Sequence, residues 1–428
     1  MLNPGFALVK LIILFRLEQY SWRSHEQRLN DSVPQFRAAI TLAASEIPLR
    51  IHFIHMRSRH AHAVPLLLIP PFPFSNFSVH QTIEQLANPD EPENNQPFHV
   101  IIPSLPGIGF SDALPDNTVA IPAIAYMLDV LMARLDYHHY IASNTGPAAS
   151  SPGMLDWKLA KYLIQNYQRS CIAFHVINPY LTPPSFRKQP LLYLKWRFAK
   201  FVNRPVFGYT VEDLRILRTS APHAQNLSLL GTNIIDPEAL DHQTLGYALC
   251  DSPTGMLSLM MTLMRLLDVK VKLPDSDLIT ITQLAWLPGP EAMLRLCSHC
   301  AGWEPERRSE HGAQKPRIGI TTFTGQRMPN EKKGNDDMLL PISRLTSNTC
   351  DVWAEPDFRV LSSSKVSGVP GFLLWERPQV IAEGVRKLFG ALDKAEKKLL
   401  VPKKNIGSEL EGIIIQEDVP AMAGPSSL

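Results

Sequence analysis

The sequence predicts an α/β protein with a mainly parallel sheet and a helical cap inserted into that sheet. Short apolar runs alternate with longer stretches of helical periodicity, beginning near Leu49. Such alternation indicates βαβ units, which build parallel sheets. It stops at Asn178 and resumes near Pro316, and the chain between these points is helical and aromatic. A helical insertion of this kind is typical of a cap over a binding cleft.

The first half of the predicted sheet rests on two apolar patterns. Leu49–Met56 alternates between apolar and polar residues, as a half-buried strand does. Val64–Ile69 is fully apolar and ends at Pro70, the pattern of a central parallel strand that leads into a loop. The other elements predicted for this half are strands at 98–103, 139–142 and 171–177 and helices at 121–135 and 157–167.

The cap and the second half of the sheet complete the predicted organisation. The strongest helical patterns of the cap cover residues 191–201 and 255–267, and strands at 316–323 and 350–360 precede a helix at 378–392. The chain after Lys394 is polar and charged, so we expect a mostly disordered tail. The predicted divisions are an N-terminal segment (1–48), a first core half (49–178), the cap (179–288), a second core half (289–394) and a tail (395–428).

Composition excludes several classes of protein. The 428 residues are 45% apolar and carry a net charge of +2. This charge, without a basic stripe interleaved with aromatic residues, argues against nucleic-acid binding. The five scattered cysteines do not form the even framework of a secreted disulfide protein. Cys297 and Cys300 resemble half of a zinc site, but no second Cys/His pair follows. We therefore expect no metal and no cofactor.

One apolar segment lies near the N-terminus. It runs from Phe6 to Phe15 and is interrupted by Lys10. A membrane-spanning helix needs about 20 apolar residues, so this segment is too short to span. No small-residue cleavage site of a signal peptide follows it. The predictions are a buried or interfacial helix, a cytoplasmic protein, and this segment as the candidate for contact with a membrane.

Several motifs follow one another in a fixed order from about residue 20 to residue 390. They are Y-S-W-R at 20–23 with Glu26 and R-L-N at 28–30, P-S-L-P-G-I-G-F-S-D at 103–112, G-Y-A-L-C-D-S-P at 246–253 and W-E-R-P at 375–378. In this order they resemble the epoxide hydrolases of the α/β-hydrolase fold, in the microsomal type with an N-terminal lid-clasping segment. The phrases G-P-A-A-S-S-P and L-T-P-P-S-F are similar to a divergent fungal branch, and the N-terminal segment looks cut short before Tyr20.

The resemblance implies a mechanism that needs several residues. An aspartate on a sharp strand-to-helix turn attacks the epoxide carbon, and a histidine held by an acid activates the water that hydrolyses the ester. Two cap tyrosines protonate the leaving oxygen, and a turn after an early strand supplies oxyanion donors. The matching positions of this chain depart from that pattern. The nucleophile position falls on Gly146, the acid turn ends at Gln326, and the histidine position falls on Gly371.

The remaining positions depart from the pattern as well. His311 is the last histidine in the chain, so no histidine follows the last strand. The oxyanion turn reads P-P-F-P at 70–73, and proline has no N–H to donate. The cap tyrosine positions fall near Ile234 and Ser298. We name Phe72, Gly146, Tyr247, Gln326 and Gly371 as candidate pocket residues.

Asp156 is the one candidate catalytic residue. With Trp157 it forms an Asp-Trp pair like that of the family, but it lies ten residues after Gly146, at the head of the next helix. The alternative interpretation is an ordinary carboxylate at a helix N-terminus, where the helix dipole favours it. A serine hydrolase is not indicated, because G-x-S-x-G is absent and Ser143 and Thr145 lack a plausible base.

Three functions remain open. The first is a divergent enzyme that acts on an apolar small molecule without the standard triad, in fungal secondary metabolism. The second is a non-catalytic protein that binds such a molecule, and the third is epoxide hydrolysis by Asp156. With a simple epoxide we expect no trapped ester and turnover near the uncatalysed rate. The sequence does not indicate an oligomeric state. The cap residues Lys188, Lys195, Arg197 and Lys200 are expected to form a solvated face, with contact to an anionic group as the alternative.

Overall fold

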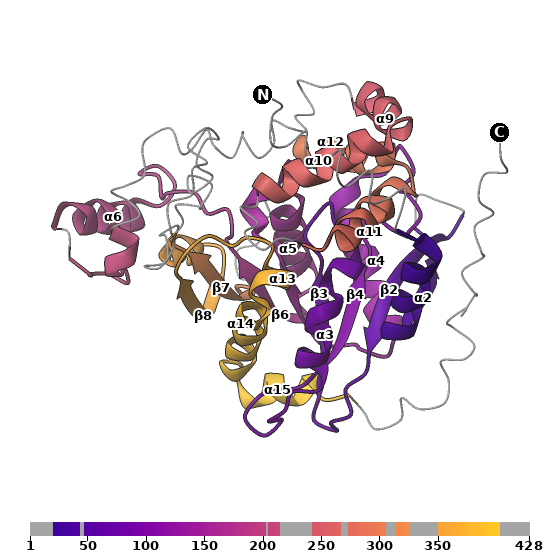
Figure 1. The fold of residues 1–428 in the computed structure, drawn as a ribbon. Coiled ribbons are helices and arrows are strands. Elements are labelled where there is room, and N and C mark those ends of the chain that lie inside the picture. Colours follow the sequence, from indigo (N-terminus) through magenta and orange to yellow (C-terminus); the bar gives the residue numbers. More distant parts are fainter. Residues whose placement is uncertain are drawn as a thin grey trace, which may run out of the picture.

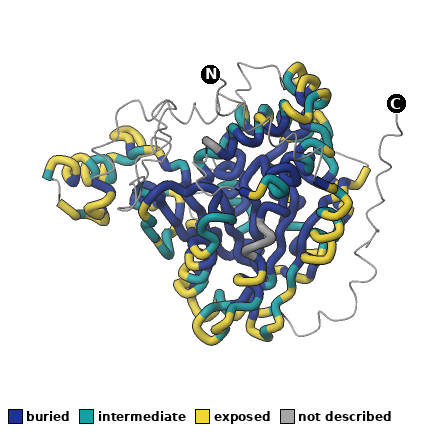
Figure 2. The backbone as a smooth tube through the Cα atoms, viewed as in Figure 1, coloured by how far each residue is buried: buried dark blue, intermediate teal, exposed yellow. Residues whose placement is uncertain are grey.

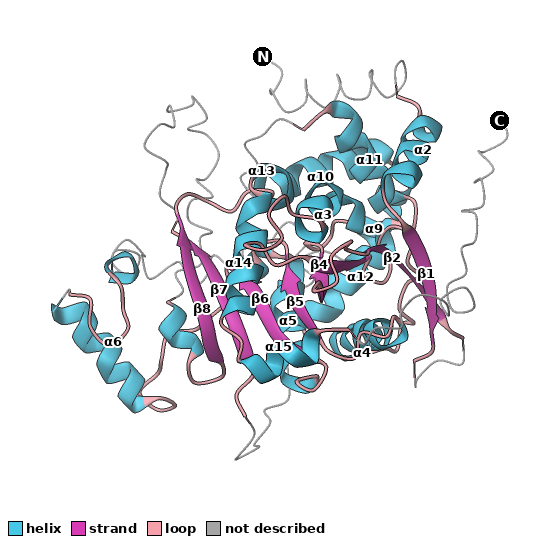
Figure 3. Cartoon of the chain, turned by 90° about the horizontal axis from the view of Figure 1, so that it is seen from below, coloured by secondary structure: helices cyan, strands magenta, loops and turns pink. Residues whose placement is uncertain are grey.

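The computed structural model describes residues 20–42, 47–202, 204–214, 242–266, 273–304, 314–324 and 350–402. Its centre is an eight-stranded sheet in the order β1-β2-β4-β3-β5-β6-β7-β8 (Figures 1 and 3). Only β2 is antiparallel to both of its neighbours, and all pairs from β4 to β8 are parallel. The strands are β1 (Gln35–Ile40), β2 (Leu49–Met56), β3 (Val64–Ile69), β4 (Phe98–Pro103), β5 (Tyr140–Asn144), β6 (Cys171–Ile177), β7 (Arg317–Phe323) and β8 (Arg359–Val366). The predicted fold class is confirmed.

Burial explains the pattern of the strands. Every residue of β3, β5 and β6 is buried, because helices cover both faces of the central sheet. Helices α4 (Ala120–Arg134) and α5 (Leu155–Asn166) contribute to the core on one face. Helices α3 (His80–Ala87), α13 (Leu373–Glu376) and α14 (Pro378–Gly390) contribute to the core on the other. Figure 2 shows these buried segments in the middle of the molecule, with exposed segments around them.

The cap lies between β6 and β7 in the chain, as predicted. It contains α6 (Pro190–Val202), α9 (His242–Cys250), α10 (Pro253–Leu266) and α11 (Asp275–Trp286), and α12 (Pro290–Ala301) follows. Helices α9 to α12 lie together above the sheet, whereas α6 projects beyond the β8 edge (Figures 1 and 3). No helix among the described residues is long and apolar enough to cross a membrane.

The N-terminal segment contacts the cap. Helix α2 (Trp22–Ser32) precedes β1. Just before α2, the hydroxyl of Tyr20 donates a hydrogen bond to Gln283 (2.9 Å) and lies 3.0 Å from the hydroxyl of Thr280, both on α11. The segment therefore joins the sheet edge to the cap. The apolar run at 6–15 lies outside the described residues.

One strand prediction in the second half is wrong, and the predicted tail begins as a helix, while residues 403–428 lie outside the described residues. The strand predicted at 350–360 is a 3-10 helix, Asp351–Ala354, followed by β8. The tail predicted from residue 395 begins as a helix, α15 (Lys394–Leu400), which starts with a capping box between Asp393 and Glu396. Glu396 also pairs with Arg317 at the start of β7, at 2.5 Å. The capping box and this ion pair order the first turns of the predicted tail.

Candidate active site

Asp156 lies in the first turn of α5, and its carboxyl group reaches the turn that follows β3. The backbone N–H of Phe72 donates to this group, with 3.3 Å from the nitrogen to each carboxyl oxygen. The side chain of Asp156 is buried, with 2% of the residue exposed. Its own N–H donates to the Ser151 hydroxyl at 3.0 Å, which fixes the start of the helix. The expectation that this turn has lost its donors is therefore wrong at Phe72.

The turn into α5 is unusual. Gly153 and Met154 both have left-handed backbones, with φ values of 64° and 52°. A non-glycine residue in this region costs of order 1–3 kcal/mol, and such strain clusters at functional sites. Gly153 is required here, because a Cβ would lie 2.7 Å from the carbonyl oxygen of Cys297 on α12. The strained turn directly before α5 directs Asp156 back toward Phe72.

Burial sets the charge state of Asp156. Desolvation raises its pKa well above the ordinary value, and the N–H of Phe72 opposes this shift more weakly. The environment thus favours the neutral carboxylic acid, which can accept from Phe72 with one oxygen and donate its own proton from the other. A proton donor in an apolar, buried position is suited to general-acid catalysis.

Gly146, at the predicted nucleophile position, lies two residues after the end of β5. A Cβ at this residue would lie 2.6 Å from the Cβ of Pro71. The backbone N–H and the hydroxyl of Thr145 both donate to the carbonyl of Ile69, at 3.1 and 3.0 Å, and this holds the turn after β3 against the end of β5. The space that an aspartate side chain would need is therefore filled by a proline ring.

The space beside Gly371, at the predicted histidine position, is also occupied by a neighbouring side chain. Its φ is +63°, and a Cβ there would lie 1.8 Å from a carboxylate oxygen of Glu376. That same oxygen accepts the N–H of Phe372 at 2.9 Å. Glu376 thus satisfies the backbone where α13 begins, and its carboxylate occupies the place of a side chain at residue 371.

The other candidate pocket residues do not all lie together. Phe72 is buried beside Asp156. Aromatic rings continue from the same turn, with Phe74 and Phe372 at 5.0 Å between ring centroids. Tyr247 is 75% exposed on α9, which is not the environment of a pocket residue. Gln326 lies outside the described residues.

Ser143 contacts a histidine that the sequence did not indicate. Its hydroxyl oxygen lies 2.9 Å from Nδ1 of His175, and Nε2 of that ring lies 2.9 Å from the hydroxyl of Thr321. The three side chains cross β5, β6 and β7 beneath α14, where a Cβ at Gly384 would lie 2.2 Å from the imidazole. Burial lowers the pKa of His175 to about 3, so the ring is neutral. This contact joins three neighbouring strands and stabilises the core.

Cys297 and Cys300 are buried on α12, and neither is part of a disulfide. The ammonium of Lys158 donates to the carbonyls of Cys300 (2.6 Å) and Ala301 (2.9 Å), so it caps the end of that helix. Among the residues that the structure describes, no group of three or more His, Cys, Asp and Glu side chains could hold a metal ion.

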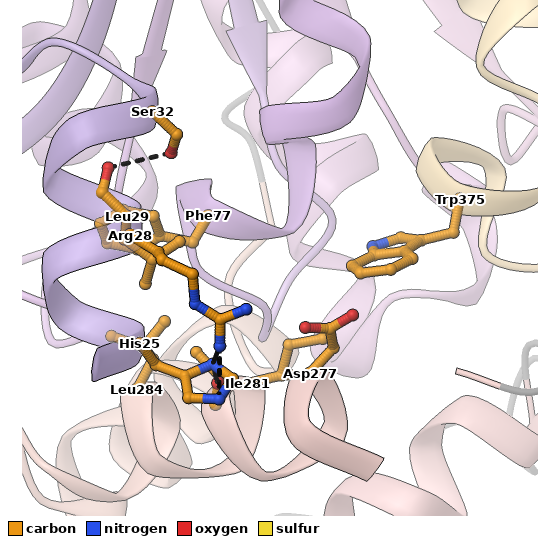
Figure 4. Close-up of a pocket in the computed structure, with 10 residues that line it drawn as sticks. His25, Arg28, Leu29, Ser32, Phe77, Asp277, Ile281, Leu284 and Trp375 are labelled. Carbon is orange, nitrogen blue, oxygen red and sulfur yellow. Dashed lines mark hydrogen bonds between the residues drawn. The ribbon is translucent and has the colours of Figure 1, made fainter. Parts of the chain in front are cut away.

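A second feature escaped the sequence analysis. A pocket of about 230 Å³ lies between α2, α11, α13 and the short helix Asn76–Val79 (Figure 4). It is lined by His25, Arg28, Leu29, Ser32, Phe77, Asp277, Thr280, Ile281, Leu284 and Trp375. One Arg28 nitrogen lies 3.0 and 2.7 Å from the two ring nitrogens of His25. Its walls come from four distant segments, so local patterns could not predict it.

Comparison with known proteins supports one family. Residues 8–79 match the model described as the epoxide hydrolase N terminus. A relative from Stigmatella aurantiaca, named "Putative epoxide hydrolase", is 29% identical over 259 residues, 59% of this chain. The match covers 50% of that relative, so this chain spans about half its length. A relative of the same name from Dothistroma septosporum is 25% identical over 389 residues, 90% of this chain and 80% of that protein.

A solved structure supports the fold. The epoxide hydrolase of Aspergillus niger superposes with a TM-score of 0.64 at 18% identity, covering 91% of this chain and 87% of that one. The N-terminal match, the relatives and the order of the sheet agree with one another. Residues 8–79 thus match the epoxide hydrolase N-terminal family, and the chain, which has the α/β-hydrolase fold, is similar over most of its length to epoxide hydrolases of the microsomal type.

Proposed function

We propose that this protein binds an apolar epoxide and opens it with Asp156 as the reacting group, without an aspartate, histidine and acid at the usual positions. The observation that supports the proposal is the hydrogen bond from the N–H of Phe72 to the buried carboxyl of Asp156. It joins a carboxyl group to the turn where the family places its oxyanion donor. The similarity to epoxide hydrolases supports the choice of an epoxide as the strained group.

The chemistry follows from the protonated carboxyl. Asp156 donates its proton to the epoxide oxygen as the carbon–oxygen bond breaks, and water adds to the carbon. The water loses one proton, which restores the acid, and the product is a diol. Phe72 stabilises the carboxylate that exists between these steps, because its N–H becomes a charge-assisted donor. General-acid assistance of this type contributes roughly 10²–10⁴-fold. This revises the expectation of turnover near the uncatalysed rate.

The surroundings favour an apolar substrate. Phe72, Phe74 and Phe372 are all buried, and burial is the main cause of the raised pKa of Asp156. A polar substrate would lose its hydration at such a position without compensating hydrogen bonds. The place of this reaction in fungal secondary metabolism is part of the proposal. It is tested by asking whether neighbouring genes encode polyketide or terpene enzymes.

The test measures diol formation from styrene oxide by the wild type, Asp156→Asn and Asp156→Ala. The asparagine variant keeps the shape and an acceptor for Phe72 but has no acidic proton. We expect both variants to lose the enzymatic rate, whereas the exposed-carboxyl control Asp357→Asn keeps it. Because the acid form reacts, the rate should fall as the pH rises through the raised pKa. Unchanged turnover in Asp156→Asn would refute the proposal.

A ligand-binding protein without turnover is the second candidate. Its support is that neighbouring groups fill the space at both Gly146 and Gly371. It predicts saturable binding of an apolar epoxide with no diol in any variant. If Asp156 acts instead as a nucleophile, intact-protein mass spectrometry of the wild type will show an ester with the mass of the epoxide. The rate will then rise with pH, the opposite of the general-acid profile.

A further inference from the structure

The outer face of α6 carries an apolar stripe that nothing in the described structure covers. Leu191, Leu194, Phe198 and Phe201 are between 51% and 88% exposed. Their spacing of three, four and three residues places them on one side of the helix. The opposite side faces the core, where Ala199 is buried and the ring of Trp196 meets that of Trp353 at 6.2 Å.

Neighbouring loops extend this stripe into a patch. Phe186 and Phe207 are exposed on either side of α6 in the chain, and Val211 follows them. The rings of Phe198 and Phe207 lie 5.8 Å apart, so the patch is continuous from the helix to the loop after it. We call these seven residues the α6 patch: four lie on α6, Phe186 and Phe207 lie on the flanking turns, and Val211 begins the helical segment 211–214. Because large side chains of this kind are normally buried, their grouping on a projecting helix indicates a binding surface.

Positive charge surrounds the α6 patch. From residue 179 to residue 211 the chain contains six basic residues and no acidic residue. All six are exposed: Arg187, Lys188, Lys195, Arg197, Lys200 and Arg204. At 100° per residue, Lys195 and Arg197 border the apolar stripe on opposite sides. The ammonium of Lys200 lies 5.9 Å from the centre of the Trp196 ring. A basic stripe interleaved with aromatic residues was not expected from the sequence, but this segment is one.

We propose that the α6 patch binds the surface of an anionic lipid bilayer. Its leucine and phenylalanine side chains would enter the boundary between headgroups and acyl chains. The flanking lysines and arginines would extend to the phosphate and carboxylate groups of the lipids. The projection of α6 from the body of the molecule (Figure 1) allows this contact without displacing the sheet or helices α9 to α12. The proposal does not depend on catalysis by Asp156.

The charges argue against a second copy of the chain as the occupant. Two such patches facing each other would bring six cations of one copy against six of the other. Like charges placed opposite one another across an interface are unfavourable. A single-stranded nucleic acid also carries the complementary charge, but it is bound by aromatic rings that stack on bases. Aliphatic side chains such as Leu191, Leu194 and Val211 suit acyl chains better than bases.

The test measures flotation of the full chain with vesicles of phosphatidylcholine alone, and with vesicles that also contain phosphatidylserine. We expect binding to the anionic vesicles that weakens with added salt. The double variant Leu194→Ser/Lys195→Glu should reduce the partition coefficient at least about tenfold, because it loses one inserted side chain and reverses one charge. The matched control is Leu399→Ser/Lys398→Glu on α15, where an exposed leucine and lysine are also adjacent (Leu194 and Leu399 are 55% and 50% exposed).

The outcomes are distinct. Equal loss in both double variants, or retained binding in the α6 variant, would show that another part of the chain binds lipid and would overturn the proposal. Absence of binding to anionic vesicles by the wild type would overturn it too. So would tighter binding to a single-stranded oligonucleotide, or dimerisation without lipid that the α6 variant abolishes. Circular dichroism of both variants establishes that they are folded.

Discussion

His175 makes the stability of this protein sensitive to acid. The ring is buried between Ser143 and Thr321, and burial lowers its pKa from 6.5 to about 3. Below pH 6.5 the imidazole of His175 therefore binds a proton in the unfolded chain, whereas in the folded chain it stays neutral until the pH approaches 3. The stability from this group is complete above pH 6.5 and is lost progressively as the pH falls toward 3. At pH 5 the solution is about 1.5 pH units below the pKa of histidine in the unfolded chain. The free energy of unfolding is then lower by roughly 2 kcal/mol because of this one group.

Two further histidines behave in the same way. Burial is the main cause that lowers the pKa of His52 and of His55 to about 3. Together with His175 they lower the free energy of unfolding by at most about 6 kcal/mol between pH 7 and pH 5. That is comparable with the whole stability of an ordinary domain, about 5–15 kcal/mol. We therefore expect cooperative acid unfolding near pH 5.

The assay is urea unfolding at pH 7 and pH 5, followed by tryptophan fluorescence. His175→Gln keeps polar atoms for Ser143 and Thr321 but does not titrate. Between pH 7 and pH 5 its free energy of unfolding should therefore fall by about 2 kcal/mol less than that of the wild type. His62→Gln, at an exposed histidine, is the matched control and should show the wild-type difference. An identical pH dependence in the wild type and His175→Gln would refute the reasoning.

Three other substitutions test the site and the N-terminal contact. Gly146→Asp should destabilise the fold by about 1–3 kcal/mol through overpacking against Pro71, which calorimetry will measure. Product analysis should show no additional diol. An unchanged melting temperature would contradict the expected destabilisation. Gly371→His should destabilise by a similar amount, because φ is positive and Glu376 occupies the space; a gain in turnover would show that an imidazole fits. Tyr20→Phe should cost about 0.5–1.5 kcal/mol and expose the N-terminal segment to limited proteolysis, because its hydrogen bond to α11 is lost; wild-type cleavage rates would speak against it.

The sequence predicted most of the sheet because its central strands are continuous apolar runs. Strand β8 was misplaced for the opposite reason. Its middle is polar, S-S-S at 362–364, as suits an edge strand, whereas the apolar residues 352–354 just before it form a buried 3-10 turn. Helix α15 was missed because its composition resembles a disordered tail. Its capping box at Asp393 and Glu396 was the local signal that could have identified it.

The site was predicted only in part, because its geometry depends on contacts between distant segments. The contact between Phe72 and Asp156 joins residues 84 positions apart. It depends on the left-handed backbone at Gly153 and Met154, which no apolar pattern reveals. The orientation of Tyr247 is also a tertiary effect. Gly246 packs closely on Glu291 of α12, where a Cβ would lie 3.0 Å from the glutamate Cβ, and Tyr247 is left on the outside.

The filled spaces at Gly146 and Gly371 also constrain how this site can change over time. A side chain introduced at either glycine meets an existing neighbour, Pro71 in one case and Glu376 in the other. An aspartate at residue 146 or a histidine at residue 371 would therefore need a matching change in that neighbour. Removing Glu376 first would leave the N–H of Phe372 without its acceptor. Each glycine is therefore sterically coupled to its neighbour, so a larger side chain at either position requires a change at Pro71 or Glu376 as well.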